Sequence, residues 1–253
     1  MNFDLKSKVA IVTGGNGGIG LGMARGLARA GATVLVAARD AGKSAEAVRE
    51  LRSLGSDAFA VDVDVSDEAS VAAMVATTVE RYGRLDILIN NAGMSIRKPV
   101  QELALDEWHQ VIDTNMTAAF LSARAAYPHM KKAGAGKVIN IGSMLSIFGA
   151  SFAPAYGASK GGVVQLTKSL AVGWAPDNIQ VNAVLPGWID TALTQGARRQ
   201  LEGLHERVVA RTPAGKWGKP DDLAGVAVFL ASAASDFITG VAIAVDGGYS
   251  SAI

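Results

Sequence analysis

The N-terminal part of the chain joins a short apolar run to a glycine-rich turn and then to a helical pattern. Lys8 to Thr13 has the composition of a buried strand, and five glycines follow within the seven residues from Gly14 to Gly20. Leu21 to Ala30 then has helical spacing. Glycines let a backbone approach a pyrophosphate closely, and the positive end of a helix dipole faces the anion. This segment therefore predicts a phosphate-binding strand–turn–helix unit.

Two glycine patterns overlap in this turn. Gly15, Gly17 and Gly20 fit G-x-G-x-x-G, whereas Thr13-Gly14 with Gly18 and Gly20 fits T-G-x-x-x-G-x-G. Either pattern alone is weak, because any tight turn favours glycine. The position directly after a predicted strand is what favours a phosphate site.

Strand-like and helical runs alternate along the whole chain. The strand-like runs are residues 8–13, 33–37, 58–63, 85–90, 137–142, 179–185 and 241–245, and the helical runs are 19–30, 41–54, 66–82, 106–131, 155–175 and 221–232. With 49% hydrophobic but only 6% aromatic residues, the core is expected to be aliphatic, which suits a parallel sheet covered on both faces. We predict a single α/β domain over residues 1–253, a doubly wound Rossmann-type fold with about seven parallel strands. Residues 187–219 are predicted to be a long loop over the substrate.

Polar residues and glycines follow several of the predicted strands directly. Asn90-Asn91-Ala92-Gly93, Gly142-Ser143 and Pro186-Gly187 each stand at such a strand end. In an open parallel sheet, ligands bind beyond the carboxyl ends of the strands. We therefore expect the functional site at this edge of the sheet.

Tyr156 and Lys160 are four residues apart in a predicted helix, which places them one turn apart on the same face. A unit positive charge about 4 Å away contributes roughly 4 kcal/mol at an effective dielectric of about 20. That energy would lower the tyrosine pKa from about 10 to near 7, where a general acid and base works best. An isolated Tyr-x-x-x-Lys is more often a solvent-facing pair, so the interpretation depends on the other motifs.

Taken together, these motifs resemble the short-chain dehydrogenase/reductase family over essentially the whole chain. They occur in the family's order and at its spacing: Thr13-Gly14-x-x-x-Gly18-Ile19-Gly20, Asp64-Val65, Asn90-Asn91-Ala92-Gly93, Asn115, Ser143, Tyr156-x-x-x-Lys160, Pro186-Gly187 and Asp246-Gly247-Gly248. The resemblance implies hydride transfer between a nicotinamide cofactor and a carbonyl or alcohol. It also implies a homotetramer, and the many small residues in the runs 106–131 and 155–175 permit close helix packing between subunits.

Four residues receive catalytic roles from this resemblance. Tyr156 would exchange a proton with the substrate oxygen, Ser143 would hydrogen-bond that oxygen, and Lys160 would lower the tyrosine pKa and reach the nicotinamide ribose. Asn115 would hold a water that links Lys160 to solvent. In isolation, Ser143 would be read as a turn cap and Asn115 as a buried amide bonded to the backbone.

The end of the second predicted strand bears on the choice of cofactor. Family members that use NAD carry an aspartate where this chain has Ala38, and Arg39 follows, where a guanidinium can fork onto a 2′-phosphate. NADP is therefore favoured, with NAD as the alternative if Arg39 only stacks on adenine. Two features count against NADP: Gly17 lacks the basic side chain that many NADP-using members place there, and the acidic Asp40 lies nearby. The resemblance assigns the cofactor to Thr13, Gly14, Asn16, Gly17, Gly18, Ile19, Gly20, Arg39, Asp64, Val65, Asn91, Ala92, Gly93, Tyr156, Lys160, Pro186, Gly187, Ile189 and Thr191.

The candidate substrate residues are Arg97, Met144, Leu145 and Trp188. Segments of the chain, including Arg211 to Gly218, resemble sugar-acid dehydrogenases such as gluconate 5-dehydrogenase and the deoxyketogluconate dehydrogenases. A cation at Arg97 would neutralise the carboxylate of such a substrate, whereas Lys98 reads as a solvated surface charge. The apolar side chains suit a bulky ketone equally well, so a general carbonyl reductase or a 3-oxoacyl thioester reductase is the alternative.

Charge and composition exclude other classes of function. The net charge is +1 with no block of like charge, which gives no support for nucleic-acid or anionic-membrane binding. The chain has no cysteine, and no metal site is expected. The N-terminus does not resemble a secretory signal, and a cytoplasmic location is expected. A dinucleotide-binding sensor would need only the glycine turn, and a scaffold subunit would need neither site; the complete catalytic set argues against both.

Overall fold

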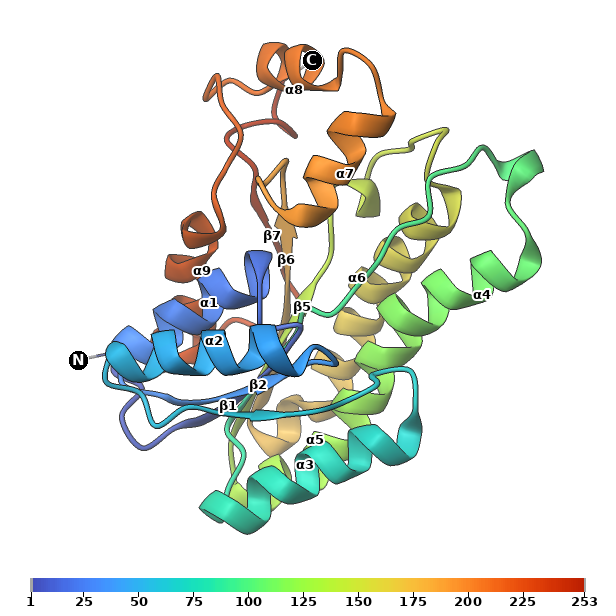
Figure 1. Cartoon of the computed structure of the whole chain (residues 1–253). Coiled ribbons are helices and arrows are strands. Elements are labelled where there is room, and N and C mark those ends of the chain that lie inside the picture. Colours follow the sequence, from blue (N-terminus) through green and yellow to red (C-terminus); the bar gives the residue numbers. More distant parts are fainter. Residues whose placement is uncertain (1, 253) are drawn as a thin grey trace.

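The structure, a computed structural model, describes residues 2–252 as a seven-stranded parallel sheet with helices on both faces (Figure 1). The strands are β1 (Val9–Thr13), β2 (Thr33–Ala37), β3 (Phe59–Val61), β4 (Ile87–Asn90), β5 (Gly136–Ile141), β6 (Ile179–Pro186) and β7 (Ala242–Val245). Their order in the sheet is β3-β2-β1-β4-β5-β6-β7, and every neighbouring pair is parallel. The doubly wound fold predicted from the sequence is confirmed.

The helices connect these strands and cover the sheet. They are α1 (Gly18–Arg29), α2 (Ala41–Ser53), α3 (Glu68–Tyr82), α4 (Leu105–Ile112), α5 (Ala118–Ala133), α6 (Pro154–Trp174), α7 (Ala192–Gln200), α8 (Leu204–Arg211) and α9 (Ala224–Ala231). Local sequence sets several of their ends: Asp67 accepts hydrogen bonds from the first turn of α3, and Gly83 ends that helix in the left-handed conformation. None of the helices in residues 2–252 has both the length and the apolar character needed to cross a membrane.

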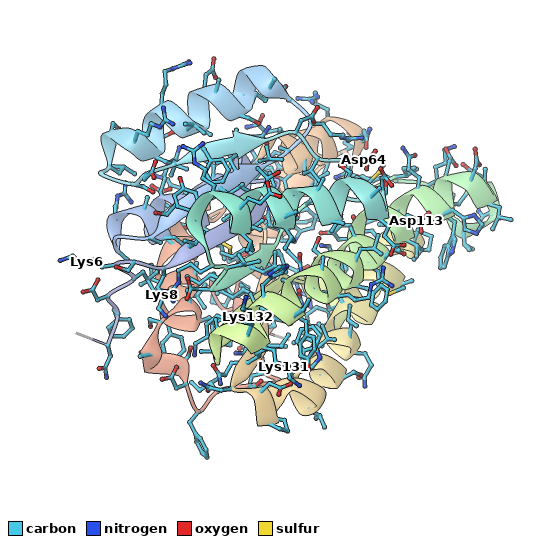
Figure 2. The ribbon with its side chains drawn as sticks, turned by 90° about the horizontal axis from the view of Figure 1, so that it is seen from below. Lys6, Lys8, Asp64, Asp113, Lys131 and Lys132 are labelled. Carbon is cyan, nitrogen blue, oxygen red and sulfur yellow. The ribbon has the colours of Figure 1, made fainter. Side chains whose placement is uncertain are left out.

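The core lies on both faces of the sheet, because successive side chains of a strand point in opposite directions. On β1, Ala10 and Val12 pack with α1, α2 and α9 on one face. Ile11 points to the other face and packs with side chains of α3 and α5, which lie side by side in Figure 2. Strands buried on both faces are nearly all apolar, which is why the strand runs were recognisable in the sequence.

The sheet order reverses between β1 and β4, and side chains hold these two strand ends together. The Thr13 hydroxyl accepts from the backbone N–H groups of Asn91 and Ala92 at 3.0 and 3.1 Å. In return, the Asn91 side-chain amide donates to the carbonyls of Thr13 and Gly14 at 2.9 and 3.2 Å. The crevice in which a doubly wound sheet binds its ligand is therefore fixed at its base.

Residues 187–219 are not a loop throughout, so that part of the prediction is wrong. They contain α7 and α8, which stand beyond the carboxyl ends of β6 and β7 (Figure 1). These helices have a small core of their own, formed by Ala197, Leu204, Val208 and Trp217. The helices are short and amphipathic, and their apolar residues pack mainly on one another, so no long hydrophobic pattern marks them in the sequence. We call residues 187–219 the lid.

Candidate active site

The glycine turn at the start of α1 has the geometry of an anion site. Gly14 and Gly18 have φ values of +63° and +51°, which only glycine adopts readily. Gly17 is the N-cap of α1 and provides no side-chain cap, and a Cβ built on Gly17 would meet no atom within 4 Å. The backbone N–H groups of the first helical turn therefore face open space, where a phosphate can bind them. The turn fits the pyrophosphate of a dinucleotide.

The neighbouring side chains close the turn from several sides. A Cβ on Gly20 would lie 2.4 Å from the Asn91 amide nitrogen, so this position has no room for another residue. Asn16 donates to the Ser44 hydroxyl on α2 at 3.2 Å, and Ile19 packs against the core. Thr191 caps α7 and its methyl carbon would lie 3.3 Å from a Cβ on Gly18. The first part of the lid, at Thr191, therefore lies directly over the glycine turn.

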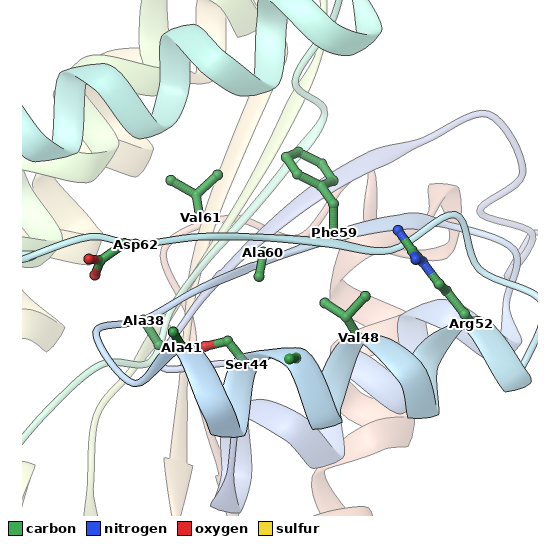
Figure 3. Close-up of a pocket in the computed structure, with 10 residues that line it drawn as sticks. Ala38, Ala41, Ser44, Val48, Arg52, Phe59, Ala60, Val61 and Asp62 are labelled. Atoms are coloured by element: carbon green, nitrogen blue, oxygen red, sulfur yellow. The ribbon is translucent and has the colours of Figure 1, made fainter.

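The end of β2 shows how the cofactor-selecting residues lie. Asp40 caps α2 by accepting from the Lys43 backbone N–H at 3.0 Å, so its carboxylate is already engaged. Arg39 is exposed and makes no side-chain hydrogen bond or ion pair with residues 2–252. Beside it, Ala38 lines a cavity of about 260 Å³ between α2 and β3, with Asp62 and Arg52 near opposite ends in Figure 3. Arg39 has no side-chain partner among residues 2–252, and its neighbour Ala38 is small. This arrangement leaves room for an additional anionic group of a ligand.

Asp64 and Val65 follow β3 in the turn before α3. The Asp64 oxygen Oδ1 accepts from the backbone N–H and the hydroxyl of Ser66, and these hydrogen bonds, with the charge of Arg39, lower the pKa of the carboxyl. The carboxylate is therefore ionised at neutral pH, with Oδ2 left as an acceptor. Val65 is buried against the core.

The catalytic candidates converge where β5 ends beside α6. Tyr156 and Lys160 lie on the first two turns of α6, and the Lys160 Nζ is 5.7 Å from the centre of the Tyr156 ring. Ser143 lies two residues after β5; its hydroxyl accepts from the Leu145 backbone N–H at 3.1 Å, and its side chain acts on the Tyr156 phenol, opposing the rise in pKa that burial causes. Ser143 is therefore a turn cap and a neighbour of the phenol at once.

The expected lowering of the Tyr156 pKa by Lys160 is not found. Desolvation of the phenolic end raises the Tyr156 pKa, while the hydrogen bond of Ser143 and the charge of Arg97 act in the opposite direction. Lys160 is 4% exposed, and its Nζ donates to the Ile141 carbonyl at 2.7 Å. Burial lowers the Lys160 pKa from 10.5 to about 8. The spacing of the two residues predicts a full positive charge close to the phenol, whereas burial disfavours charge on both groups.

Asn115 lies in a π-helical segment, Asp113–Thr117, between α4 and α5. Its side chain accepts from the Met94 backbone N–H at 2.8 Å and donates to the Met94 carbonyl at 3.0 Å. It also donates to the buried Ser159 hydroxyl at 2.9 Å. A Cβ on Gly93 would lie 3.1 Å from the Asn115 Oδ1 and 3.5 Å from the Lys160 Nζ. Asn115 is thus a buried amide bonded to the backbone, and it fixes the turn after β4 close to Lys160; its role with a water stays a prediction.

On the substrate side, Arg97 carries the positive charge that acts on Tyr156. Its guanidinium donates to the Leu193 carbonyl at 3.0 Å and to Gln200 Oε1 at 3.3 Å, both on α7. Burial lowers the pKa of Arg97, and its interaction with Tyr156 opposes this. Lys98, in contrast, forms an ion pair with Glu107 on α4. Its charge therefore belongs to the protein surface, as expected from the sequence.

The remaining candidates lie in the lid, at the end of β6 and in the turn after β5. Met144 is buried and Leu145 partly buried in that turn, and Trp188 meets Trp217 edge to face with ring centres 5.4 Å apart. Ile189 is buried. Pro186 ends β6, and a Cβ on Gly187 would lie 2.6 Å from the Asp246 Cα, so Gly187 is required by close packing with the turn after β7.

Three residues with a part in this site were missed by sequence reasoning. Ser159 links the Tyr156 carbonyl to Asn115, and its place inside the run Tyr156 to Lys160 was a usable signal. Leu193 and Gln200 hold Arg97 from α7. No local pattern announces them, because their partner lies about a hundred residues earlier in the chain.

Comparison with known proteins places this geometry in context. A family model described as enoyl-(acyl carrier protein) reductase matches residues 14–250. The 2-dehydro-3-deoxy-D-gluconate 5-dehydrogenase of Bacillus subtilis (strain 168) is 42% identical over 98% of this chain and 96% of its own length. The cis-4-hydroxycyclohexanecarboxylate dehydrogenase of Sinomonas cyclohexanicum is 41% identical over 97% of this chain and 96% of its own length.

Among solved structures, a gluconate 5-dehydrogenase from Burkholderia cenocepacia J2315, crystallised with NADP and tartrate, is 40% identical. It superposes with a TM-score of 0.94, and the match covers 100% of this chain and 98% of that one. The similarity thus extends over the whole fold.

The depressed pKa of Lys160 leads to a prediction for stability without bound ligand. Folded Lys160 loses its proton at about pH 8, whereas the unfolded lysine keeps it to 10.5. Between these values the unfolded state binds more protons, so this group makes the free energy of unfolding rise with pH, by roughly 3 kcal/mol over the full interval. Urea unfolding at several pH values should therefore show wild type gaining stability relative to Lys160→Met above pH 8. Parallel pH profiles for the two proteins would show that Lys160 is not desolvated.

Proposed function

The chain belongs to the short-chain dehydrogenase/reductase family, and on this premise we propose that it transfers a hydride between NADP(H) and the secondary alcohol or ketone of a sugar acid. The observation that carries the proposal is the convergence of Ser143, Tyr156 and Lys160 beyond β5, beside an arginine with unused hydrogen-bond donors. A dinucleotide-binding sensor would need no such set.

The glycine turn and the strand ends next to it would hold the cofactor. The N–H groups at the start of α1, around Gly17 and Gly18, would bind its pyrophosphate, and Arg39 would take the 2′-phosphate that distinguishes NADP. Support comes from the exposure of Arg39 and from the engagement of Asp40 in capping α2. The similar gluconate 5-dehydrogenase was solved with NADP. When bound, the nicotinamide supplies or accepts the hydride.

The protein's own residues would move the proton. Tyr156 would give its hydroxyl proton to the carbonyl oxygen in reduction and take it back in oxidation, while Ser143 holds the same oxygen. Lys160, with its pKa near 8, is able to exchange a proton with the phenol or with water at a physiological pH. Asn115 would keep the turn after β4 in place against Lys160.

Arg97 would bind the carboxylate of the substrate. Support comes from the charge of Arg97, which acts on Tyr156 and opposes the rise in the pKa of the phenol that burial causes. The names of the similar enzymes support this class, because gluconate, its deoxy-keto derivative and hydroxycyclohexanecarboxylate each combine a carboxylate with an alcohol or ketone. A general carbonyl or 3-oxoacyl thioester reductase, favoured by the apolar Met144 and Leu145, is the alternative.

A substrate panel tests this proposal. Wild type should have its highest kcat/KM on a sugar acid with NADP(H), above that on cyclic ketones and acetoacetyl thioesters. Tyr156→Phe keeps the ring but removes the proton, so turnover should fall by roughly 10²- to 10⁴-fold while fluorescence titration still detects nucleotide binding. A variant that retains most of its turnover would contradict the role of Tyr156, and no activity on any sugar acid would favour the alternative.

The cofactor preference is expected to depend on Ala38. Ala38→Asp places a carboxylate next to the proposed 2′-phosphate site, and the cavity beside it has room for the longer side chain. Like charges repel, so the ratio of kcat/KM with NADP to that with NAD should fall by about tenfold or more. Ala45→Asp, which adds the same charge at an exposed residue of α2 that also lines the cavity, is the control. A wild type that already prefers NAD would contradict the role of Arg39.

Assembly as a homotetramer with two-fold interfaces is the last part of the proposal, together with the cytoplasmic location that the sequence predicts. Large apolar side chains are exposed on single subunits, among them Val172 (80%) on α6 and Phe237 (103%) before β7. Closed symmetry is the usual way in which soluble homo-oligomers cover such surfaces. Sedimentation velocity at micromolar concentration should report about four times the chain mass of 26.0 kDa; a single species at the chain mass would contradict this.

A further inference from the structure

The substrate arginine of the proposed function is held from the lid. Arg97 lies after β4, and its two hydrogen bonds go to α7: one to the Leu193 carbonyl at 3.0 Å, the other to Gln200 Oε1 at 3.3 Å. No other side-chain partner of Arg97 occurs within residues 2–252. Arg97, which would bind the substrate carboxylate, is thus in direct contact with α7, the lid helix that would cover the substrate.

One face of α7 is shaped for this contact. Leu193, Gly196 and Gln200 are spaced i, i+3 and i+7, so they lie along one side of the helix. A Cβ on Gly196 would lie 4.0 Å from the Arg97 Nη1, so the guanidinium lies against the backbone of the helix between its two partners. The contact therefore spans two turns of α7.

The rest of α7 is anchored elsewhere, which gives that face a fixed position. Ala197 is buried in the lid core, and the Arg198 guanidinium lies 3.8 Å from the centre of the Trp217 ring. Gln195, also on α7, donates to Asp190 and not to Arg97. This packing of α7 thus fixes the positions of Leu193 and Gln200.

Arg97 keeps free donors for a ligand. A guanidinium has five N–H donors, and α7 engages two of them. The others have no partner among residues 2–252, while the charge acts on Tyr156. An arginine whose Nη1 and Nη2 are each held by α7, and which keeps N–H donors for a ligand, is preorganised to bind a carboxylate, because less side-chain freedom is lost on binding.

We propose that Gln200, with the Leu193 carbonyl, is a positioning residue that aims Arg97 at the substrate carboxylate, so that selection of anionic substrates depends on the docked lid helix α7. This inference rests on the proposed sugar-acid function and adds to it the origin of charge selectivity. Gln200 does not touch the substrate; it acts through Arg97.

The test compares kcat/KM on a sugar acid with kcat/KM on a neutral ketone, and we call the quotient the charge preference. Gln200→Met removes the acceptor but keeps the length of an exposed side chain, so the protein should fold. The charge preference should fall by about two- to tenfold, the value of one hydrogen bond. The change should appear in KM for the sugar acid more than in kcat.

The matched control is Gln195→Met, the same chemical change on the same helix at a side chain that bonds Asp190. It should leave the charge preference as in wild type. Arg97→Ala should lower the preference by about ten- to a hundredfold, as expected for a charge-assisted hydrogen bond. Adding Gln200→Met to Arg97→Ala should change nothing further, because Gln200 then has nothing to position.

The outcomes separate the two proposals. A wild type that prefers the sugar acid, with a Gln200→Met variant whose preference is unchanged or higher, would overturn the positioning role alone; a higher preference would mean that Gln200 competes with the substrate for Arg97. An equal fall in Gln195→Met would show a general effect on α7 and would also overturn it. A wild type with no activity on sugar acids would overturn both proposals.

Discussion

The site depends on how the ends of β1 and β4 are joined where the sheet order reverses. Four hydrogen bonds cross this point: the backbone N–H groups of Asn91 and Ala92 donate to the Thr13 hydroxyl, and the Asn91 side-chain amide donates to the carbonyls of Thr13 and Gly14. A Cβ on Gly20 would lie 2.4 Å from both the Asn91 amide nitrogen and the Gly14 carbonyl oxygen. The join therefore needs glycine at the start of α1, and it sets the position of the anion site and of the turn after β4 together.

From this join, the contacts continue to the catalytic pair. The turn after β4 places Gly93 against Asn115 and Lys160, and Asn115 bonds both Met94 and Ser159. Ser159 in turn donates to the Tyr156 carbonyl. A chain of buried and partly buried hydrogen bonds thus ties the turn after β4 to the backbone of α6, and such support is the usual requirement for a site that must hold an atom for reaction.

Burial governs the charges in this site. It lowers the pKa of Lys160 to about 8 and raises that of Tyr156, so it disfavours the charged form of each group. Arg97 keeps its positive charge at neutral pH and is held by the lid. On the proposed function, an anionic substrate would meet the fixed charge of Arg97, held by a helix that packs on its own small core. The same contact would then link recognition of the substrate to its covering by the lid.

The sequence by itself determined the fold class, because strands buried on both faces must be apolar throughout and glycine is required at the tight turn after β1. It also located all seven strands, and it named residues that the structure brings together: Ser143, Tyr156 and Lys160 beyond β5, with Arg97, whose charge acts on Tyr156. These are local patterns, or motifs whose order along the chain follows the sheet.

Only the tertiary structure decided the rest. The pKa directions of Tyr156 and Lys160 depend on desolvation by the surrounding elements, and spacing along a helix carries no information about that. The lid helices α7 and α8 are stabilised by packing on each other and on Trp217, so their short patterns in the sequence predict a loop. The partnership of Arg97 with Gln200 joins residues about a hundred positions apart, and a contact of that range exists only once the lid has folded over the sheet.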